Sequence, residues 1–311
     1  MDGATARLTP ADFARAFGVS EADLPASTRA LAAAGPFAYR RLSRDERDRV
    51  ILGVLDRIEG GFQQVGAHRD GIWESAWSET AARFRSSGHD LAALEPTFIG
   101  ASPIVRLHGD YAEAADPRFE LAAFEVFRDW MFRTFLGDCD RLLEFGCGSG
   151  FNLAAFARAF PAKAAVGLDW APAAVALVDE IAAKHGFRLT GRRFDFFAPD
   201  PDLALGPGDA VATFCALEQV GPRFGPFLDF LLERRPRLCV HMEPTLEHYD
   251  PDRLPDRLAI RYHRHRDYLD GFLTRLQALE AEGLIRLLDV RRLGWGSLYH
   301  ECHSFTAWTP A

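Results

Sequence analysis

Residues 142–152 combine the residue types and the spacing most able to do chemistry in this chain. They read Leu-Leu-Glu-Phe-Gly-Cys-Gly-Ser-Gly-Phe-Asn, an apolar run that contains Glu144 and leads into three glycines where a helical pattern begins. A glycine-rich turn between a strand and a helix lets the backbone approach a nucleotide cofactor, and the N–H groups at the helix start point at the ligand. A dinucleotide fingerprint would need a glycine at position 151, which is Phe, so the spacing does not fit that fingerprint.

Two further acids end predicted strands downstream of this turn. Asp169 follows the apolar run 164–168, and Asp195 ends the segment 191–194. Glu144, the three glycines and these two acids together resemble the cofactor motifs of class I S-adenosylmethionine-dependent methyltransferases, over about residues 138–311. On its own, each acid could instead cap the helix that follows it, because Asp is a favoured N-cap.

The resemblance implies S-adenosylmethionine as the cofactor and S-adenosylhomocysteine as the product. In that family the acid after the second strand binds the ribose hydroxyls and the acid after the third binds the adenine amino group, with an aromatic ring on the adenine face. The cofactor-binding residues implied here are Arg106, Glu144, Gly146, Cys147, Gly148, Gly150, Asn152, Asp169, Trp170, Asp195, Phe196, Ala216 and Glu218. Of these, Cys147 is expected to be a small packing residue in the loop.

The resemblance also implies the fold, an α/β doubly wound sheet of seven strands in the order 3-2-1-4-5-7-6 with the last strand antiparallel. Residues 138–311 are expected to form this domain, and residues 1–137 a mainly helical cap. Ser43 and Glu46 form a capping-box pattern for a helix to about Ile58. A second helix is expected over 71–84, where the spacing of Trp73 and Trp77 favours a core stripe.

Residues 95–111 are rich in proline and glycine and are expected to form an extended arm. By comparison with class I methyltransferases that carry helical extensions, this arm could fold over the cofactor. Arg106 would then reach the cofactor carboxylate and Tyr111 would close the pocket. The alternative for Arg106 is a surface ion pair.

Proton-transfer groups follow the later strands, at the edge where open α/β sheets bind ligands. Methyl transfer to a hydroxyl or ammonium needs a proton acceptor, and histidine suits that role at neutral pH. His241 with Glu243 is the first candidate base, and His300 or His303 the second, although each histidine could equally be structural. A metal-assisted alternative would use His241, Glu243, His300, Glu301 and His303, but no fixed-spacing metal motif is present.

The acceptor is expected to be a small polar metabolite. No Asn/Asp-Pro-Pro-Tyr/Phe motif and no Pro-Cys nucleophile follows the fourth strand, where the chain reads Ala216-Leu217-Glu218-Gln219. The net charge of −8 disfavours nucleic acid as a partner, and Arg261, Arg264 and Arg266 favour an anionic substrate, unless they are simply solvated. The alternatives are an RNA- or protein-modifying methyltransferase, a non-catalytic cofactor-binding protein and an aminopropyltransferase, although the paired aspartates of the last are missing.

Composition favours a cytoplasmic enzyme. The five cysteines form no Cys-x-x-Cys pair, which fits reduced thiols rather than a disulfide framework. No stretch reaches the roughly 20 apolar residues of a membrane span, and Met1-Asp2-Gly3-Ala4 does not begin a signal-peptide pattern. We therefore expect no membrane association, and the sequence indicates no particular oligomeric state.

Overall fold

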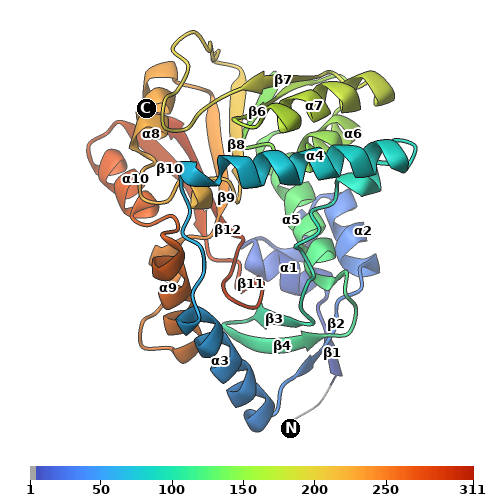
Figure 1. Ribbon diagram of the computed structural model, residues 1–311, viewed down its shortest axis with the longest axis vertical. Coiled ribbons are helices and arrows are strands. Elements are labelled where there is room, and N and C mark those ends of the chain that lie inside the picture. The colour runs from blue at the N-terminus through green and yellow to red at the C-terminus, as the bar shows by residue number, and fades with distance from the viewer. Residues whose placement is uncertain (1–4) are drawn as a thin grey trace.

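A seven-stranded sheet forms the centre of the computed structural model, which describes residues 5–311 (Figure 1). The strand order is β10-β12-β9-β8-β5-β6-β7, and every pairing is parallel except the two made by β12. The strands are β5 (Arg141–Phe145), β6 (Ala164–Asp169), β7 (Leu189–Arg193), β8 (Asp209–Phe214), β9 (Leu238–Glu243), β10 (Ile285–Arg291) and β12 (Ser304–Pro310). Numbered within the sheet, this is the predicted order 3-2-1-4-5-7-6 with the last strand antiparallel, so the fold prediction is confirmed.

Helices cover both faces of the sheet, because its central strands are apolar on both sides. Strands β8 and β9 are buried along their whole length, and two separate hydrophobic clusters lie on the two faces. The helices of this part of the chain are α5 (Phe119–Phe135), α6 (Phe151–Ala159), α7 (Pro172–His185), α8 (Gly225–Arg234), α9 (Leu254–Arg266) and α10 (Phe272–Ala281). Five short 3₁₀ helices connect elements of the chain: η1 (Glu21–Asp23), η2 (Ala67–Arg69), η3 (Leu91–Leu94), η4 (Leu217–Gln219) and η5 (Leu246–His248).

The N-terminal region is mainly helical, as predicted. Its helices are α1 (Pro10–Ala16), α2 (Ala26–Ala34), α3 (Arg44–Glu59) and α4 (Asp70–Ser86). Helix α3 begins with the expected capping box, in which the Ser43 hydroxyl accepts from the Glu46 amide and the Glu46 carboxylate accepts from the Ser43 amide. The segment 1–4, considered above for a targeting signal, lies outside the described residues.

The sequence analysis missed a second, antiparallel sheet, which lies at the lower end of the molecule in Figure 1. Its order is β1-β2-β4-β3-β11, with β1 (Thr5–Arg7), β2 (Ala38–Arg41), β3 (Ile104–Leu107), β4 (Asp110–Ala114) and β11 (Trp295–Gly296). The predicted extended arm therefore ends in a hairpin. Its turn residues His108 and Gly109 have φ of 54° and 75°, the left-handed conformations that a two-residue hairpin turn requires.

Strand β11 connects the two regions of the chain. It comes from the loop between β10 and β12, yet it pairs with β3 of the N-terminal sheet through Trp295–Leu107 and Gly296–Arg106. Helix α9 also packs against α3. The boundary at residue 137 remains a prediction, but the structure shows that the two regions share a sheet. Within residues 5–311, no helix has both the length and the apolar character needed to span a membrane.

Candidate functional site

The glycine loop between β5 and α6 is shaped by three left-handed residues. Gly146, Gly148 and Gly150 have φ of 73°, 51° and 71°, a conformation that side chains disfavour. Space is also restricted, since a Cβ on Gly146 would lie 2.4 Å from the Ala216 Cβ and one on Gly148 would lie 2.7 Å from the Trp77 ring. The loop thus requires glycine at both positions and leads directly into the N-terminus of α6.

Glu144 lies beside this loop with one carboxylate oxygen unpartnered. Its Oε1 accepts from the Asn152 amide at 3.0 Å, and the Asn152 oxygen accepts from Arg128 at 3.0 Å. Its Oε2 is buried and has no hydrogen-bond partner among the described residues. Burial raises the pKa of Glu144 to about 8, against the opposing effects of Asn152 and Arg128. A buried, unpartnered carboxylate oxygen of this kind fits a cationic group of a ligand.

Asp169 is the last residue of β6, the neighbour of β5, and Asp195 lies two residues after the end of β7, the neighbour of β6. Asp169 is buried and accepts from the Gly148 amide at 2.9 Å and the Ala171 amide at 3.0 Å. Burial raises its pKa, and these backbone bonds partly oppose the rise. It does not cap α7, whose N-cap is Ala171 without a side-chain bond, so the alternative reading as a helix cap does not apply to Asp169.

Asp195 is exposed, and one of its oxygens accepts from the Phe197 amide at 2.8 Å. The neighbouring Phe196 ring would lie 3.6 Å from a Cβ placed on Gly146. Trp170 is half-buried after β6. Because the sheet order is β5-β6-β7, the loop and both acids lie at one edge of the sheet. Cys147 is buried within the loop, where burial raises the pKa of its thiol, as expected for a packing residue.

Helix α4 crosses this edge of the sheet (Figure 1). Glu74 accepts from the Ala173 amide at the start of α7 at 3.1 Å. Trp73 and Trp77 are half-buried and stacked, with ring centroids 5.6 Å apart, and Trp77 packs on Gly148. The sequence analysis placed this aromatic pair in the core, whereas the structure places it over the glycine loop.

The structure corrects the two roles considered for Arg106 and the role considered for Tyr111. Arg106 is fully buried and donates to the Pro255 carbonyl at 2.7 Å and to Asp256 at 2.9 Å, with Glu301 3.7 Å away. It is therefore neither at the cofactor site nor in a surface ion pair. The Tyr111 ring is buried 5.7 Å from the Arg106 guanidinium, so it packs on this cluster instead of closing the pocket.

The first candidate base does not fit its predicted role. His241 is buried in the sheet, where Nδ1 shares a hydrogen bond with the Thr213 hydroxyl at 3.0 Å and Nε2 accepts from Trp308 Nε1 at 3.0 Å. Burial lowers the pKa of His241 to about 3. Both ring nitrogens are thus occupied, and neither is left to accept a proton from a substrate.

Glu243 acts on the loop after β8. Its two oxygens accept from the amides of Ala216 at 3.0 Å and Glu218 at 3.2 Å. Burial raises its pKa to about 7, opposed by these hydrogen bonds and one from Thr213. Glu243 therefore positions η4, the segment that faces the glycine loop through Ala216.

The remaining predicted groups do not form a metal site. His303 lies between the rings of Phe124 and Trp295, and burial lowers its pKa to about 3. Glu301 is bound by Arg292 at 2.7 and 2.8 Å. Within the described part of the chain, no group of three His, Cys, Asp or Glu side chains could hold a metal ion. The five candidate ligands therefore give the metal alternative no geometric basis.

His300, the remaining predicted histidine, is buried against residues of α9 and the segment after it. Its Nδ1 shares a hydrogen bond with His263 Nε2 at 3.1 Å, and its ring lies 5.1 Å from Tyr262 and 5.8 Å from Tyr268. Burial, followed by the charges of His263 and other neighbours, lowers the pKa of His300 well below its ordinary value.

Glu218 lies on η4 and is half-buried. Its Oε1 accepts from the Gln219 amide at 2.8 Å, and the Gln219 oxygen accepts from Arg69 at 2.6 Å. Among the described residues, no other hydrogen bond to its carboxylate is present. Burial and the nearby Glu243 raise the pKa of Glu218 to about 8. The sequence analysis placed Glu218 with the cofactor and gave no signal for Arg69.

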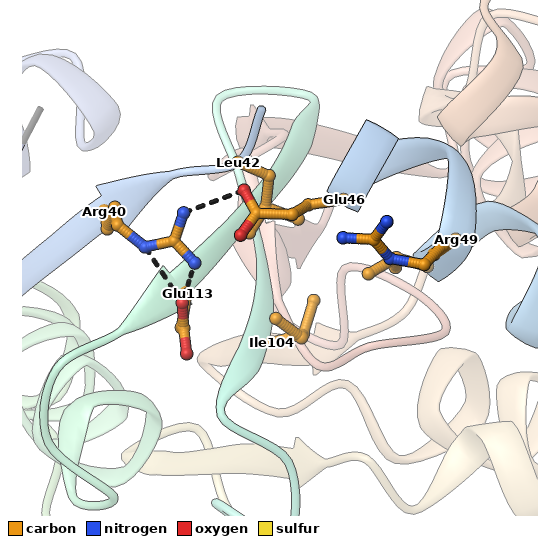
Figure 2. A pocket seen from close by; sticks show the side chains of 7 residues that line it. Arg40, Leu42, Glu46, Arg49, Ile104 and Glu113 are labelled. Atoms are coloured by element: carbon orange, nitrogen blue, oxygen red, sulfur yellow. Dashed lines mark hydrogen bonds and ion pairs between the residues drawn. The ribbon is translucent and has the colours of Figure 1, made fainter. Parts of the chain in front are cut away.

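Two hollows of the surface lie away from this site. The larger, of about 340 Å³, is lined by residues of α3 and the N-terminal sheet, and its Arg40 is paired with Glu46 and Glu113 (Figure 2). The smaller, of about 120 Å³, lies between α1 and the β3–β11 end of the same sheet. The charges lining the larger hollow neutralise one another, and neither hollow contains the glycine loop.

The glycine loop lies at one edge of the sheet, together with Glu144 of β5, Asp169 of β6 and Asp195 after β7. The fold is that of the class I methyltransferases. No protein-family model and no curated protein matches the sequence.

Solved structures with a related fold include several methyltransferases. One is an O-methyltransferase (NcsB1) from neocarzinostatin biosynthesis in complex with S-adenosylmethionine and 2-hydroxy-5-methyl naphthoic acid, at 15% identity and a TM-score of 0.43, over 63% of this chain and 59% of that one. Another is an O-methyltransferase family 2 protein from Planctomyces limnophilus in complex with apigenin, at 14% identity and 0.41, over 57% and 53%.

The chain is also similar to the [4+2]-cyclase SpnF, at 16% identity and a TM-score of 0.47, over 74% of this chain and 77% of that one. The chain spans about three fifths of the length of the first O-methyltransferase. At these identities the likeness describes the fold only.

Proposed function

We propose that the protein is an S-adenosylmethionine-dependent methyltransferase that acts on an oxygen or nitrogen of a small anionic metabolite. The observation that carries the proposal is the convergence of Glu144, Asp169 and Asp195 on one sheet edge around a loop of left-handed glycines. Glu144 would face the amino-acid end of the cofactor, Asp169 the ribose and Asp195 the adenine, with Phe196 on the adenine face. The free oxygen of Glu144 and the exposed carboxylate of Asp195 fit these roles.

The cofactor supplies an electrophilic methyl group on a sulfonium, and direct displacement needs no covalent bond to the protein. The protein must hold the acceptor atom in line with the methyl group and remove a proton when that atom is a hydroxyl or ammonium. The C–S bond breaks, the new C–O or C–N bond forms, and the proton goes to a side chain beside the acceptor.

We assign this proton acceptor to Glu218. It lies on η4, whose N-cap Ala216 faces the glycine loop, and the one described hydrogen bond to its carboxylate comes from Gln219. Its raised pKa, about 8, makes its carboxylate a stronger base than an ordinary glutamate. His300 packs against Tyr268, but its strongly lowered pKa makes it a weak base. Glu243 would be a positioning residue, because it holds the amides on both sides of Leu217.

Calorimetric titration with S-adenosylmethionine and S-adenosylhomocysteine tests the cofactor assignment. We expect micromolar binding that weakens about tenfold or more in Asp195→Ala, as for loss of a hydrogen bond to a charged group. Asp116→Ala is the matched control, because Asp116 makes the same kind of turn, to the Arg118 amide, away from the sheet edge. Asp169→Ala is less informative, since Asp169 also holds the loop. Absence of binding of either ligand to the folded wild-type protein would contradict the proposal.

The base assignment is tested once an acceptor has been found by screening. Glu218→Gln should lower kcat by about 10²- to 10⁴-fold and leave the affinity for S-adenosylmethionine unchanged. The rate of the wild-type enzyme should rise with pH toward about 8, where Glu218 ionises, and the variant should lose this dependence. Exposed Glu233→Gln is the control, and an unchanged kcat in Glu218→Gln would exclude this role.

A further inference from the structure

Arg266 is a buried arginine that has no acidic partner. It lies at the end of α9 with 9% of its surface exposed. One of its Nη atoms donates to the Gln63 carbonyl and the other to the Tyr268 hydroxyl, while Nε is buried without a partner. No described acidic side chain forms an ion pair with it. Leaving a buried cation and a buried N–H group without compensation is costly.

Arg69 is half-buried and likewise forms no ion pair with a described side chain. It belongs to η2, its guanidinium lies 5.1 Å from the Trp73 ring centroid, and its Nε is also buried without a partner. Burial lowers the pKa of Arg69, and the positive charge of Arg266 lowers it further. The backbone also brings the two arginines near each other, because the Val65 amide donates to the Arg266 carbonyl at 2.9 Å and the Arg69 amide donates to the Gly66 carbonyl at 3.0 Å.

The cluster around Arg106 provides a contrast within the same molecule. There, Arg106 and Arg292 are both paired with Asp256 and Glu301 at distances of 2.6 to 3.7 Å. The chain thus pairs Arg106 and Arg292 with two carboxylates, whereas Arg69 and Arg266 form no ion pair with a described side chain and have only the charge of Glu218 nearby. Arginines without ion-pair partners are expected at a site for an anionic ligand when the ligand is not bound.

Arg69 and Arg266 lie at the proposed acceptor site. Gln219 connects Arg69 to Glu218 through two hydrogen bonds. Tyr262 and Tyr268, with ring centroids 5.6 Å apart, lie on the Arg266 side, and Phe62 and Tyr299 pack against Tyr262. A ligand held here would lie beside the proposed base and against aromatic rings.

We propose that Arg69 and Arg266 bind a carboxylate of the methyl acceptor, with one free Nε–H from each arginine donating to one of its oxygens. This inference rests on the proposed function, and it names the acceptor as a carboxylated small molecule. Two donors on two side chains match the two oxygens of a carboxylate, and the aromatic rings suit a cyclic body. The sequence analysis associated three arginines with an anionic substrate. Of these, Arg261 and Arg264 are exposed and only Arg266 is buried.

Calorimetric titration of the full chain with benzoate, benzamide and inorganic phosphate, without S-adenosylmethionine, tests the proposal. We expect saturable binding of benzoate, with benzamide at least about tenfold weaker because it lacks the charge, and phosphate weaker than benzoate. Arg69→Met should weaken benzoate binding about tenfold or more. Arg264→Met, on the exposed face of α9, should leave it unchanged.

The affinity of each variant for S-adenosylmethionine is measured separately, so that failure of the cofactor assignment and failure of the anion site give different results. An Arg69→Met protein that keeps cofactor binding and also keeps wild-type benzoate affinity would overturn the proposal. Equal binding of benzoate and benzamide would also overturn it, and so would tighter binding of phosphate, which would assign the pair to a phosphate ligand.

Discussion

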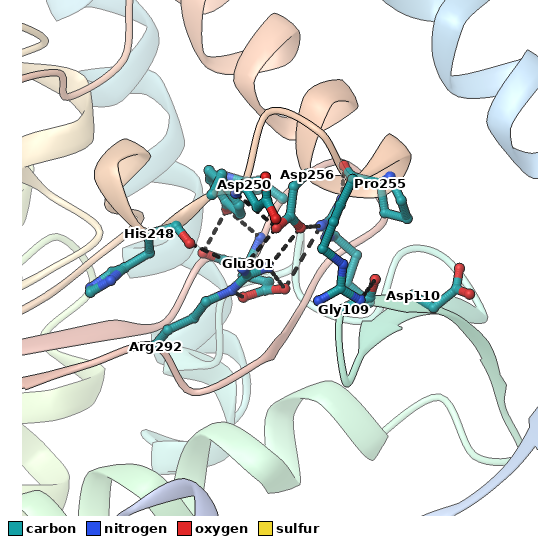
Figure 3. Close-up of polar contacts among 12 residues, drawn as sticks. Gly109, Asp110, His248, Asp250, Pro255, Asp256, Arg292 and Glu301 are labelled. Atoms are coloured by element: carbon teal, nitrogen blue, oxygen red, sulfur yellow. Dashed lines mark hydrogen bonds and ion pairs between the residues drawn. The ribbon is translucent and has the colours of Figure 1, made fainter.

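Asp256 is the acidic centre of the buried cluster in Figure 3, and its replacement gives a direct measure of that cluster. Asp256 is fully buried in the first turn of α9 and accepts from Arg106 at 2.9 Å, from Arg292 at 2.6 Å and from the Asp250 amide at 3.1 Å. Asp256→Asn removes the charge and leaves two guanidinium groups with Glu301 alone. Removing one partner of a buried ion pair costs about 3–5 kcal/mol.

The assay is thermal and urea unfolding of the purified variant beside the wild-type protein. At about 2 °C per kcal/mol for a chain of this size, we expect Tm to fall by roughly 6–10 °C. Glu180→Gln is the control, because its partner Arg85 is 57% exposed and such pairs contribute about 1 kcal/mol or less. A loss in Asp256→Asn no larger than in the control would refute the claim that the cluster is desolvated and stabilising.

The pH dependence gives an independent check on Asp256. Burial opposes its ionisation, but hydrogen bonds from Arg292 and the Asp250 amide, together with the arginine charges, hold its pKa below the ordinary value of 3.8. A carboxyl group with a lowered folded pKa stabilises the protein above its unfolded pKa. The difference in unfolding free energy between wild type and variant should therefore be full at neutral pH and shrink as the pH falls below 3.8. A difference that stayed constant to lower pH would contradict this.

Two further predictions concern the cofactor site. Glu144 has a pKa of about 8 in the unliganded protein, so it should release a proton when a cationic cofactor binds. The affinity for S-adenosylmethionine should therefore rise with pH, by up to about tenfold per pH unit between about pH 5.5 and 7. Calorimetry in buffers of different ionisation enthalpy measures the proton release, which Glu144→Gln should abolish; pH-independent affinity would contradict it. Trp77 packs on Gly148, so cofactor binding should change the tryptophan fluorescence, and Trp77→Phe should lose most of that change while still binding. An unchanged signal in Trp77→Phe would show that the indole does not face the cofactor.

The central sheet could be predicted from sequence because its signals are local. Each signal lies within a short stretch of chain: the apolar runs of the strands, the glycine turn, and the acids near the ends of β5, β6 and β7. The resemblance to a known family supplied the order of the strands. The capping box at Ser43 likewise lies within four residues. In contrast, the N-terminal sheet has strands of two to five residues, and apart from the β3–β4 hairpin their partners are far apart in the chain, so no local pattern indicates the whole sheet.

The candidate site was predicted only where one segment carries the whole signal. The alternation of a strand places His241 on a face, but its partners Thr213 and Trp308 come from two other strands. Arg106 is paired with residues about 150 positions away, so its burial in an ion cluster could not be read from its own segment. The proposed ligand-binding role of Arg69 depends on its position near Arg266, which belongs to a helix far away in the chain. All these roles depend on contacts between residues that are far apart in the chain, and such contacts cannot be read from a single sequence.

The pairing of β11 with β3 also constrains how the protein can be made. During synthesis Trp295 and Gly296 emerge almost 190 residues after β3. Until then, the edge of β3 is an unpaired strand, with Val105 and Leu107 not yet buried as they are in the finished fold, and such edges invite association with other chains. The N-terminal sheet therefore cannot be completed before the C-terminal half has folded onto it. A chain interrupted before residue 295 would leave the ribosome with this edge exposed.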